Sequence, residues 1–270
     1  MKRSNHTKAR IISANKPTLF TRIKSYKRTP VSVLAKKIIR RLHDRSYEFF
    51  YLPNLRDEFK SLKLSGHAIQ KLLDDYIFDT VLDVGSGEGI HTDIFVKYGK
   101  NVTAIDYGKS AYFEQNISSV KTIVADFNNH DFDCQFDVVW CSHVLEHQLN
   151  VNLFLEKANS ALKDGGYLAV TVPPSRNTIV GGHVTNWNAG LLIYNLVLAG
   201  FDCSDAKILQ YGYNISVIAK KSSKRVNKSE LSFDNGDIRL IRTWLPKFDF
   251  FSTETDDPFY GTIRSHNWNN

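Results

Sequence analysis

Between about residues 66 and 220, short apolar runs alternate with longer amphipathic stretches. This alternation is typical of βαβ units that assemble into a doubly wound, mostly parallel sheet with helices on both faces. The last two apolar runs are joined by only a few residues around Gly212, too few for a crossover, so we expect that pair to be antiparallel. The runs interpreted as strands are 80–84, 102–105, 122–125, 136–141, 167–172, 205–210 and 214–219, and the helices between them include 88–98, 151–162 and 187–198.

The basic character of the chain comes from one end of the sequence. The formal net charge is +7, but residues 1–45 hold 14 lysines and arginines against a single aspartate, so the remainder is acidic overall. Within this arm, an apolar stripe from Val31 to Leu42 with basic residues opposite predicts an amphipathic helix. We divide the chain into a basic N-terminal extension (1–65), a central domain (66–220), and a linker with an aromatic tail (221–270) that packs back on the domain.

Several roles fit the basic helix. It could cover the domain's binding site, present a solvated positive face, or contact RNA phosphates, although Phe20 and Tyr26 are the only Phe, Tyr or Trp residues of 1–45 for stacking on bases. It could also place residues 30–45 on an anionic membrane, where each basic residue contributes about 1 kcal/mol. Three scattered cysteines, and the lack of a long apolar run or signal-peptide pattern, predict a cytoplasmic protein, peripheral at the inner membrane surface if the arm binds lipid.

A glycine-rich segment, VLDVGSGEGIHT at 81–92, runs from the first expected strand into a helix. Gly85, Gly87 and Gly89 would let a ligand approach the backbone and leave helix N–H groups free to donate hydrogen bonds. The spacing differs from the dinucleotide fingerprint GxGxxG, because the third glycine comes one residue early. The segment therefore indicates a nucleoside-containing ligand and argues against an NAD-linked oxidoreductase.

Two carboxylates follow successive strands. Asp106 ends the second strand about 20 residues after the loop, where a carboxylate can accept both hydroxyl groups of a ribose. Asp126 follows the third strand, and Phe127 comes next. We interpret this pair as a site for adenine, with the amino group donating to Asp126 and the ring packing on Phe127.

Four segments together resemble a known family. VLDVGSGEGIHT, VTAIDYG, VADFNN and FDVVWCSHVLEH resemble motifs I to IV of the class I S-adenosylmethionine-dependent methyltransferases, in particular the small-molecule and glycan type that carries HVLEH. The resemblance covers about residues 66–220. It implies a Rossmann-like sheet of seven strands and S-adenosyl-L-methionine as the cofactor. By the same resemblance, the cofactor-binding residues would be Asp83, Gly85, Gly87, Gly89, Asp106, Tyr107, Asp126, Phe127 and Ser142.

Histidines after the fourth strand are candidates for the chemical step. Methyl transfer from a sulfonium leaves a neutral thioether, so the protein's tasks are alignment and removal of the acceptor's proton. His143 and His147 are spaced i, i+4, which places them on one face of a helical turn at the carboxyl edge of the sheet. His147 is our first candidate for the base. Glu146, His147 and a third ligand could hold a metal, but we expect none, because the two residues are adjacent and would point in different directions on a helix.

The loop at 175–188 is the expected acceptor loop. It contains His183, a further candidate base, and Trp187, which suits a polar ring packing on an aromatic face. We expect O-methylation, with a sugar hydroxyl of a glycan precursor as the acceptor; enzymes that resemble this type also act on quinones and other small molecules. The alternatives are a cofactor-binding scaffold without transfer activity and an RNA-directed methyltransferase.

Overall fold

The computed structural model describes residues 52–113, 120–234, 236–247 and 263–269. Contacts divide the chain into two units, Met1–Leu52 and Pro53–Asn270. The basic helix expected at 31–42, and residues 30–45 as a whole, lie outside the described residues. The following description concerns the unit that begins at Pro53.

The unit is built on one sheet of eight strands in the order β3-β2-β1-β4-β5-β7-β6-β8. β1 pairs in parallel with β2 and β4, and the parallel arrangement continues outward to β3 and β5. β7 is antiparallel to both β5 and β6, as the short connection at Gly212 predicts. The strands are β1 (Thr80–Val84), β2 (Asn101–Asp106), β3 (Lys121–Val124), β4 (Phe136–Ser142), β5 (Leu162–Val172), β6 (Phe201–Tyr211), β7 (Asn214–Lys221) and β8 (Ser265–His266).

The expected fold class, a doubly wound and mostly parallel sheet with an antiparallel final strand pair, is confirmed. The difference is the eighth strand, in which two residues near the C-terminus pair with the outer edge of β6. A two-residue strand carries no periodicity that a sequence pattern could show.

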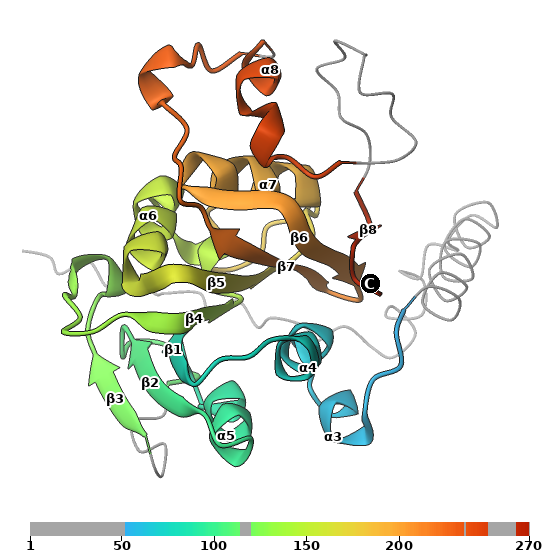
Figure 1. Ribbon diagram of the computed structural model, residues 1–270. Helices are drawn as coiled ribbons and strands as arrows, with labels where there is room; N and C mark the ends of the chain where they lie inside the picture. Colours follow the sequence, from blue (N-terminus) through green and yellow to red (C-terminus); the bar gives the residue numbers. More distant parts are fainter. Residues whose placement is uncertain (1–51, 114–119, 235, 248–262, 270) are drawn as a thin grey trace, which may run out of the picture. The chain divides into compact units, whose positions relative to one another are not determined.

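Helices cover both faces of the sheet. Figure 1 shows α6 and α7 on one face and α4 and α5 on the other. In α6, Phe154, Leu155 and Ala158 are buried, while Leu162, the last residue of the helix expected at 151–162, begins β5. The α-helices are α3 (Asp57–Lys60), α4 (Gly66–Asp75), α5 (Ile90–Lys97), α6 (Val151–Ala161), α7 (Ala189–Leu198) and α8 (Asp237–Ile241), and the 3₁₀ helices are η1 (Phe127–Asn129), η2 (Leu145–His147), η3 (Lys228–Glu230) and η4 (Arg242–Trp244).

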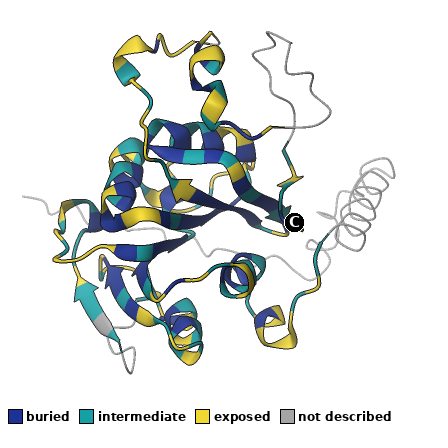
Figure 2. Ribbon diagram, viewed as in Figure 1, coloured by how far each residue is buried: buried dark blue, intermediate teal, exposed yellow. Residues whose placement is uncertain are grey.

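The core lies along the central strands, which are coloured as buried in Figure 2. β4 is buried from Val138 through Cys141, the continuous apolar run that a parallel strand covered on both faces requires. Because β1, β2 and β4 run in parallel, their carboxyl ends meet at one edge of the sheet. The turns after these strands therefore lie together, on a rigid platform.

The compact unit is longer than the central domain expected at 66–220. On the N-terminal side, Phe59 is 1% exposed and stacks on Tyr98. On the C-terminal side, Ile241 and Leu245 join the main core, and Trp268 is buried. Apolar side chains on both flanks thus extend the core. In the part of the chain that the structure describes, no helix has the length and apolar character needed to cross a membrane.

Candidate active site

The glycine loop connects β1 to α5 and brings its backbone close to the turn after β4. Gly85 has φ +72°, and a Cβ built on it would lie 2.3 Å from Cγ2 of Val144. Its N–H donates to the carbonyl of Ile105 at 2.8 Å, which fixes the loop to β2. A side chain at this position would push the loop away from β4, so the approach requires glycine.

Asp106 ends β2 and points into the same turn. Its two carboxylate oxygens accept hydrogen bonds from the N–H of Gly87 at 3.0 Å and of Gly108 at 2.8 Å. Each oxygen keeps a lone pair for a further donor. The carboxylate is thus held at the carboxyl end of the sheet with its remaining acceptor capacity available to a ligand, as predicted for a ribose site.

Asp126 and Phe127 begin the short helix η1. The side chain of Asp126 accepts from the N–H of Asn128 at 3.0 Å and so caps this helix. Phe127 is 6% exposed and packs on Phe154, with ring centroids 5.0 Å apart. Both residues line the cavity described below, as an adenine site would require.

Asp83 and Gly89 do not line that cavity. Asp83 lies in β1, is 2% exposed, and accepts a hydrogen bond from Oγ1 of Thr92 at 2.5 Å. Burial raises the pKa of Asp83 to about 7, an effect that the nearby Asp106 carboxylate reinforces. Gly89 is the N-cap of α5. Asp83 thus contacts α5, and its contact with the cofactor's amino group stays a prediction.

The predicted helical turn carrying His143 and His147 is wrong. His143 adopts a left-handed backbone conformation, φ 56°, and its N–H donates to Thr171 on the neighbouring strand β5. Only residues 145–147 form a helix, the 3₁₀ turn η2. β4 pairs with β5 as far as Ser142, and the chain then bends at His143, so the turn starts later than the i, i+4 spacing implied.

The two histidines still converge, because both contact Glu146. This carboxylate is 1% exposed; its Oε1 lies 3.3 Å from Nδ1 of His143 and 3.8 Å from Nε2 of His147. The expectation that Glu146 and His147 point in different directions is therefore wrong, because a single 3₁₀ turn replaces the assumed α-helix. Sequence spacing on an ideal helix does not apply there.

Hydrogen bonds fix both rings. Nε2 of His143 lies 3.0 Å from Oδ1 of Asn214 in the β6–β7 hairpin. Nδ1 of His147 lies 2.8 Å from the carbonyl of Gly182. Since a carbonyl only accepts, His147 donates through Nδ1, and in the neutral ring Nε2 carries the free lone pair.

His183 also belongs to this cluster, and Trp187 does not. The rings of His147 and His183 meet edge to face with centroids 5.1 Å apart. Trp187 was expected to offer an aromatic face to the acceptor, but it is 2% exposed and its indole N–H donates to Oγ1 of Thr185. Trp187 instead packs in the main core, which anchors the loop.

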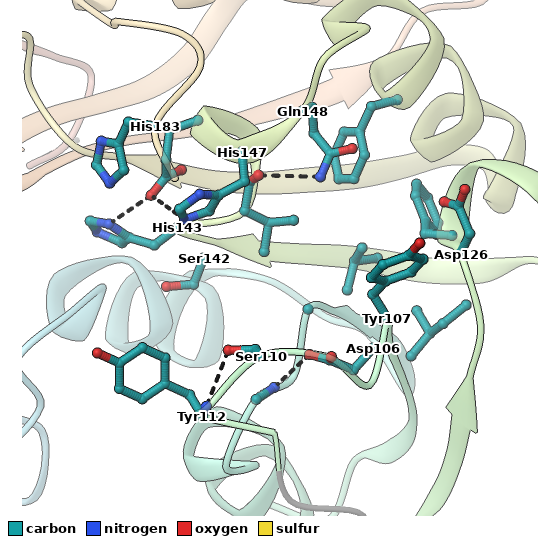
Figure 3. Close-up of a pocket in the computed structure, with 18 of the residues that line it drawn as sticks. Asp106, Tyr107, Ser110, Tyr112, Asp126, Ser142, His143, His147, Gln148 and His183 are labelled. Carbon is teal, nitrogen blue, oxygen red and sulfur yellow. Dashed lines mark hydrogen bonds and ion pairs between the residues drawn. The ribbon is translucent and has the colours of Figure 1, made fainter. Parts of the chain in front are cut away.

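The carboxylates of Asp106 and Asp126 and the three histidines line one cavity of about 980 Å³. Figure 3 shows His143, His147 and His183 at one end of it, and Asp106, Tyr107 and Asp126 toward the other. The cavity is large enough for two small ligands end to end. Ten of the predicted site residues line it: Gly85, Gly87, Asp106, Tyr107, Asp126, Phe127, Ser142, His143, His147 and His183.

Sequence reasoning missed residues that reach the cavity from elsewhere in the chain. Tyr213, in the β6–β7 hairpin, stacks on His143 with ring centroids 5.8 Å apart and an interplanar angle of 29°. Asn128 and Gln148 line the cavity and hydrogen-bond to each other at 3.3 Å. Asn128 lies within the third motif and Gln148 directly follows the fourth, so both positions were a usable signal. Nothing in the sequence near Tyr213 marks it.

Comparison with known proteins supports the fold assignment. Residues 82–170, which run from β1 into β5, match the family described as "Methyltransferase domain". In structure, the chain is similar to a SAM-dependent methyltransferase from Archaeoglobus fulgidus, with a TM-score of 0.50 and 18% identity over 66% of this chain and 98% of that one. The fold is that of the class I methyltransferases, and S-adenosylmethionine is the cofactor that this domain and fold indicate.

Curated relatives match over part of their length. The chain is 30% identical over 129 residues to the ubiquinone biosynthesis O-methyltransferase of Shewanella pealeana, which is 42% of this chain and 53% of that protein. It is 33% identical over 115 residues to the protein of the same name from Rickettsia bellii, 39% of this chain and 48% of that one. The chain thus spans about half the length of the curated relatives it matches. The narrower resemblance to the glycan type stays a prediction.

Proposed function

We propose that this protein transfers a methyl group from S-adenosylmethionine to a hydroxyl oxygen of a polar small molecule. The observation that carries the proposal is the two-ended cavity, with carboxylates at one end and a histidine cluster at the other. The curated relatives, which are named as O-methyltransferases, support oxygen as the receiving atom.

The carboxylate end suits the cofactor. Asp106 keeps free acceptor positions for ribose hydroxyl groups, and Asp126 lies beside an aromatic surface provided by Phe127. Gly85 and Gly87 of the glycine loop line the cavity beside these carboxylates. When bound, the cofactor supplies an electrophilic methyl group and leaves as a neutral thioether.

The histidine end suits a hydroxyl acceptor. A hydroxyl must lose its proton as its oxygen bonds to carbon, and positioned groups that assist such a proton transfer are worth about 10²–10⁴ in rate. The bond from His147 to Gly182 leaves the Nε2 lone pair of His147 as the group through which this end activates the acceptor. Tyr213 adds an aromatic surface beside His143. A sugar hydroxyl, approached by polar groups and an aromatic face, is the acceptor that we favour.

Calorimetry with variants tests the cofactor end. Asp106→Ala removes a charged acceptor of two ribose hydrogen bonds, each worth about 1.5–3 kcal/mol, so we expect at least about 100-fold weaker binding of S-adenosylmethionine. Asp131→Ala is the matched control, because that carboxylate is fully exposed and pairs with Lys157. Equal affinity for Asp106→Ala and wild type, with both folded by circular dichroism, would contradict the assignment.

Methyl transfer itself is measured with radiolabelled cofactor and two acceptor panels, one of nucleotide-linked sugars and free glycans, the other of phenols. Label transferred to a sugar supports the favoured acceptor. Transfer to phenols alone would support O-methylation as the reaction and exclude a sugar as the acceptor. Binding of the cofactor without transfer to either panel, and with no change for His147→Ala or His183→Ala, supports the scaffold alternative.

A further inference from the structure

Three potential metal ligands converge at the acceptor end of the cavity. Ligand atoms of Glu146, His147 and His183 all lie within 4.8 Å of one another. The first two come from η2, and His183 comes from the loop between β5 and α7. The combination of two imidazoles and one carboxylate is a donor set that divalent transition metals occupy in proteins.

One carboxylate oxygen of Glu146 has no hydrogen-bond partner. The residue is 1% exposed, and its Oε2 is buried without any hydrogen bond. Leaving a buried charged oxygen unpartnered costs more than the about 1–3 kcal/mol typical of a neutral group. A cation beside this carboxylate would remove that cost.

The hydrogen bonding of His147 also favours a metal ion at this place. Its Nδ1 is committed to the carbonyl of Gly182, so its Nε2 lone pair faces Oε1 of Glu146 at 3.8 Å. That separation is too long for a hydrogen bond. An imidazole whose far nitrogen donates to a backbone carbonyl, leaving the near nitrogen bare, is the arrangement of metal-bound histidines.

The loop that carries His183 is hydrogen-bonded to the backbone of Glu146. The N–H groups of Val184 and Thr185 both donate to the backbone carbonyl of Glu146, at 2.9 and 3.2 Å. The buried Trp187 anchors the loop farther along. His183 is therefore held next to η2 by main-chain bonds, as a preformed site requires.

His143 completes the support without being a ligand. Its Nδ1 contacts Oε1 of Glu146, and its Nε2 contacts Asn214. Both ring nitrogens thus have partners, and the contact of His143 is with Oε1, which leaves Oε2 without a partner. We regard His143 as a positioning residue.

We propose that Glu146, His147 and His183 bind a divalent transition-metal ion of the zinc type at the acceptor end of the cavity. Zn²⁺–N distances of about 2.0–2.1 Å bring tetrahedral ligand atoms about 3.3 Å apart, so the observed 3.8 Å between Glu146 and His147 closes with small rotamer shifts. A three-residue set leaves a coordination position open.

The open position gives the ion a role, and this part rests on the proposed function. With Nε2 of His147 bound to the ion, the ion takes over activation of the acceptor: a hydroxyl bound at the open position would have a lowered pKa and would release its proton to water. Its oxygen then bonds to the methyl carbon while the carbon–sulfur bond breaks, and the electron pair of that bond stays on sulfur. The step needs no oxidant or reductant.

Metal binding can be measured without any acceptor. Chelator-treated protein is titrated with Zn²⁺ in a calorimeter, and Co²⁺ is added separately to record its ligand-field absorption. We expect one ion per chain, and a loss of affinity above the roughly 10–100-fold typical of outer-shell partners for His147→Ala and for His183→Ala. His130→Ala is the matched control, because His130 packs on Phe132 and does not line the cavity.

Two results would overturn the metal site: wild-type protein that takes up no ion, or His147→Ala and His183→Ala variants that bind Zn²⁺ as the control does. His183 lies in a loop and is replaced without disturbing the core, so a folded variant is expected. Unchanged methyl transfer by metal-free protein would remove the ion's role and leave the proposed function intact. Stoichiometric binding without transfer to any acceptor would support the site and count against the proposed function.

Discussion

Replacing Gly85 by alanine tests how the glycine loop is held against the turn after β4. Two costs follow from the structure. The residue has φ +72°, where an L-residue costs roughly 1–2 kcal/mol. The new Cβ would also lie 2.3 Å from Cγ2 of Val144, and overpacking of this kind costs about 1–3 kcal/mol. We therefore expect a loss of about 2–5 kcal/mol in the free energy of unfolding.

Two further variants separate these costs. Gly99 has φ +74° with nothing within 4 Å of its Cβ position, so Gly99→Ala should show the backbone cost alone, about 1–2 kcal/mol. Adding Val144→Ala to Gly85→Ala should recover the steric part, measured as a coupling energy in a double-mutant cycle. Urea denaturation followed by tryptophan fluorescence gives each value. The reasoning fails if Gly85→Ala costs no more than Gly99→Ala, or if Val144→Ala gives no coupling.

Two other predictions concern a buried carboxyl and the basic arm. Because burial raises the pKa of Asp83 to about 7, the folded state keeps a proton that the unfolded chain releases near pH 4, so Asp83 removes stability as pH rises from about 4 to about 7. The stability of Asp83→Asn relative to wild type should grow by up to about 4 kcal/mol over that interval in parallel urea titrations, and a constant difference would contradict the raised pKa. For the arm, deletion of residues 1–45 should abolish co-sedimentation with anionic liposomes, and an unchanged pelleted fraction would exclude membrane binding.

The sequence by itself determined the sheet, its antiparallel end and the carboxylates that line one end of the cavity. These features depend on local patterns: apolar runs of strand length, glycines between a strand and a helix, and Asp106 and Asp126 at or just after the ends of successive strands. Since parallel strands deliver their carboxyl ends to one edge, a residue's place along its strand was enough to locate it in space.

Only the tertiary structure decided the histidine end of the cavity. β4 pairs with β5 up to Ser142, the chain bends at His143, and the expected helix is shortened to one 3₁₀ turn that brings Glu146 and His147 together. His183 and Tyr213 reach the same place from a loop and a hairpin far along the chain. Such contacts depend on how separate elements pack, and packing between distant segments leaves no periodic signal in either one.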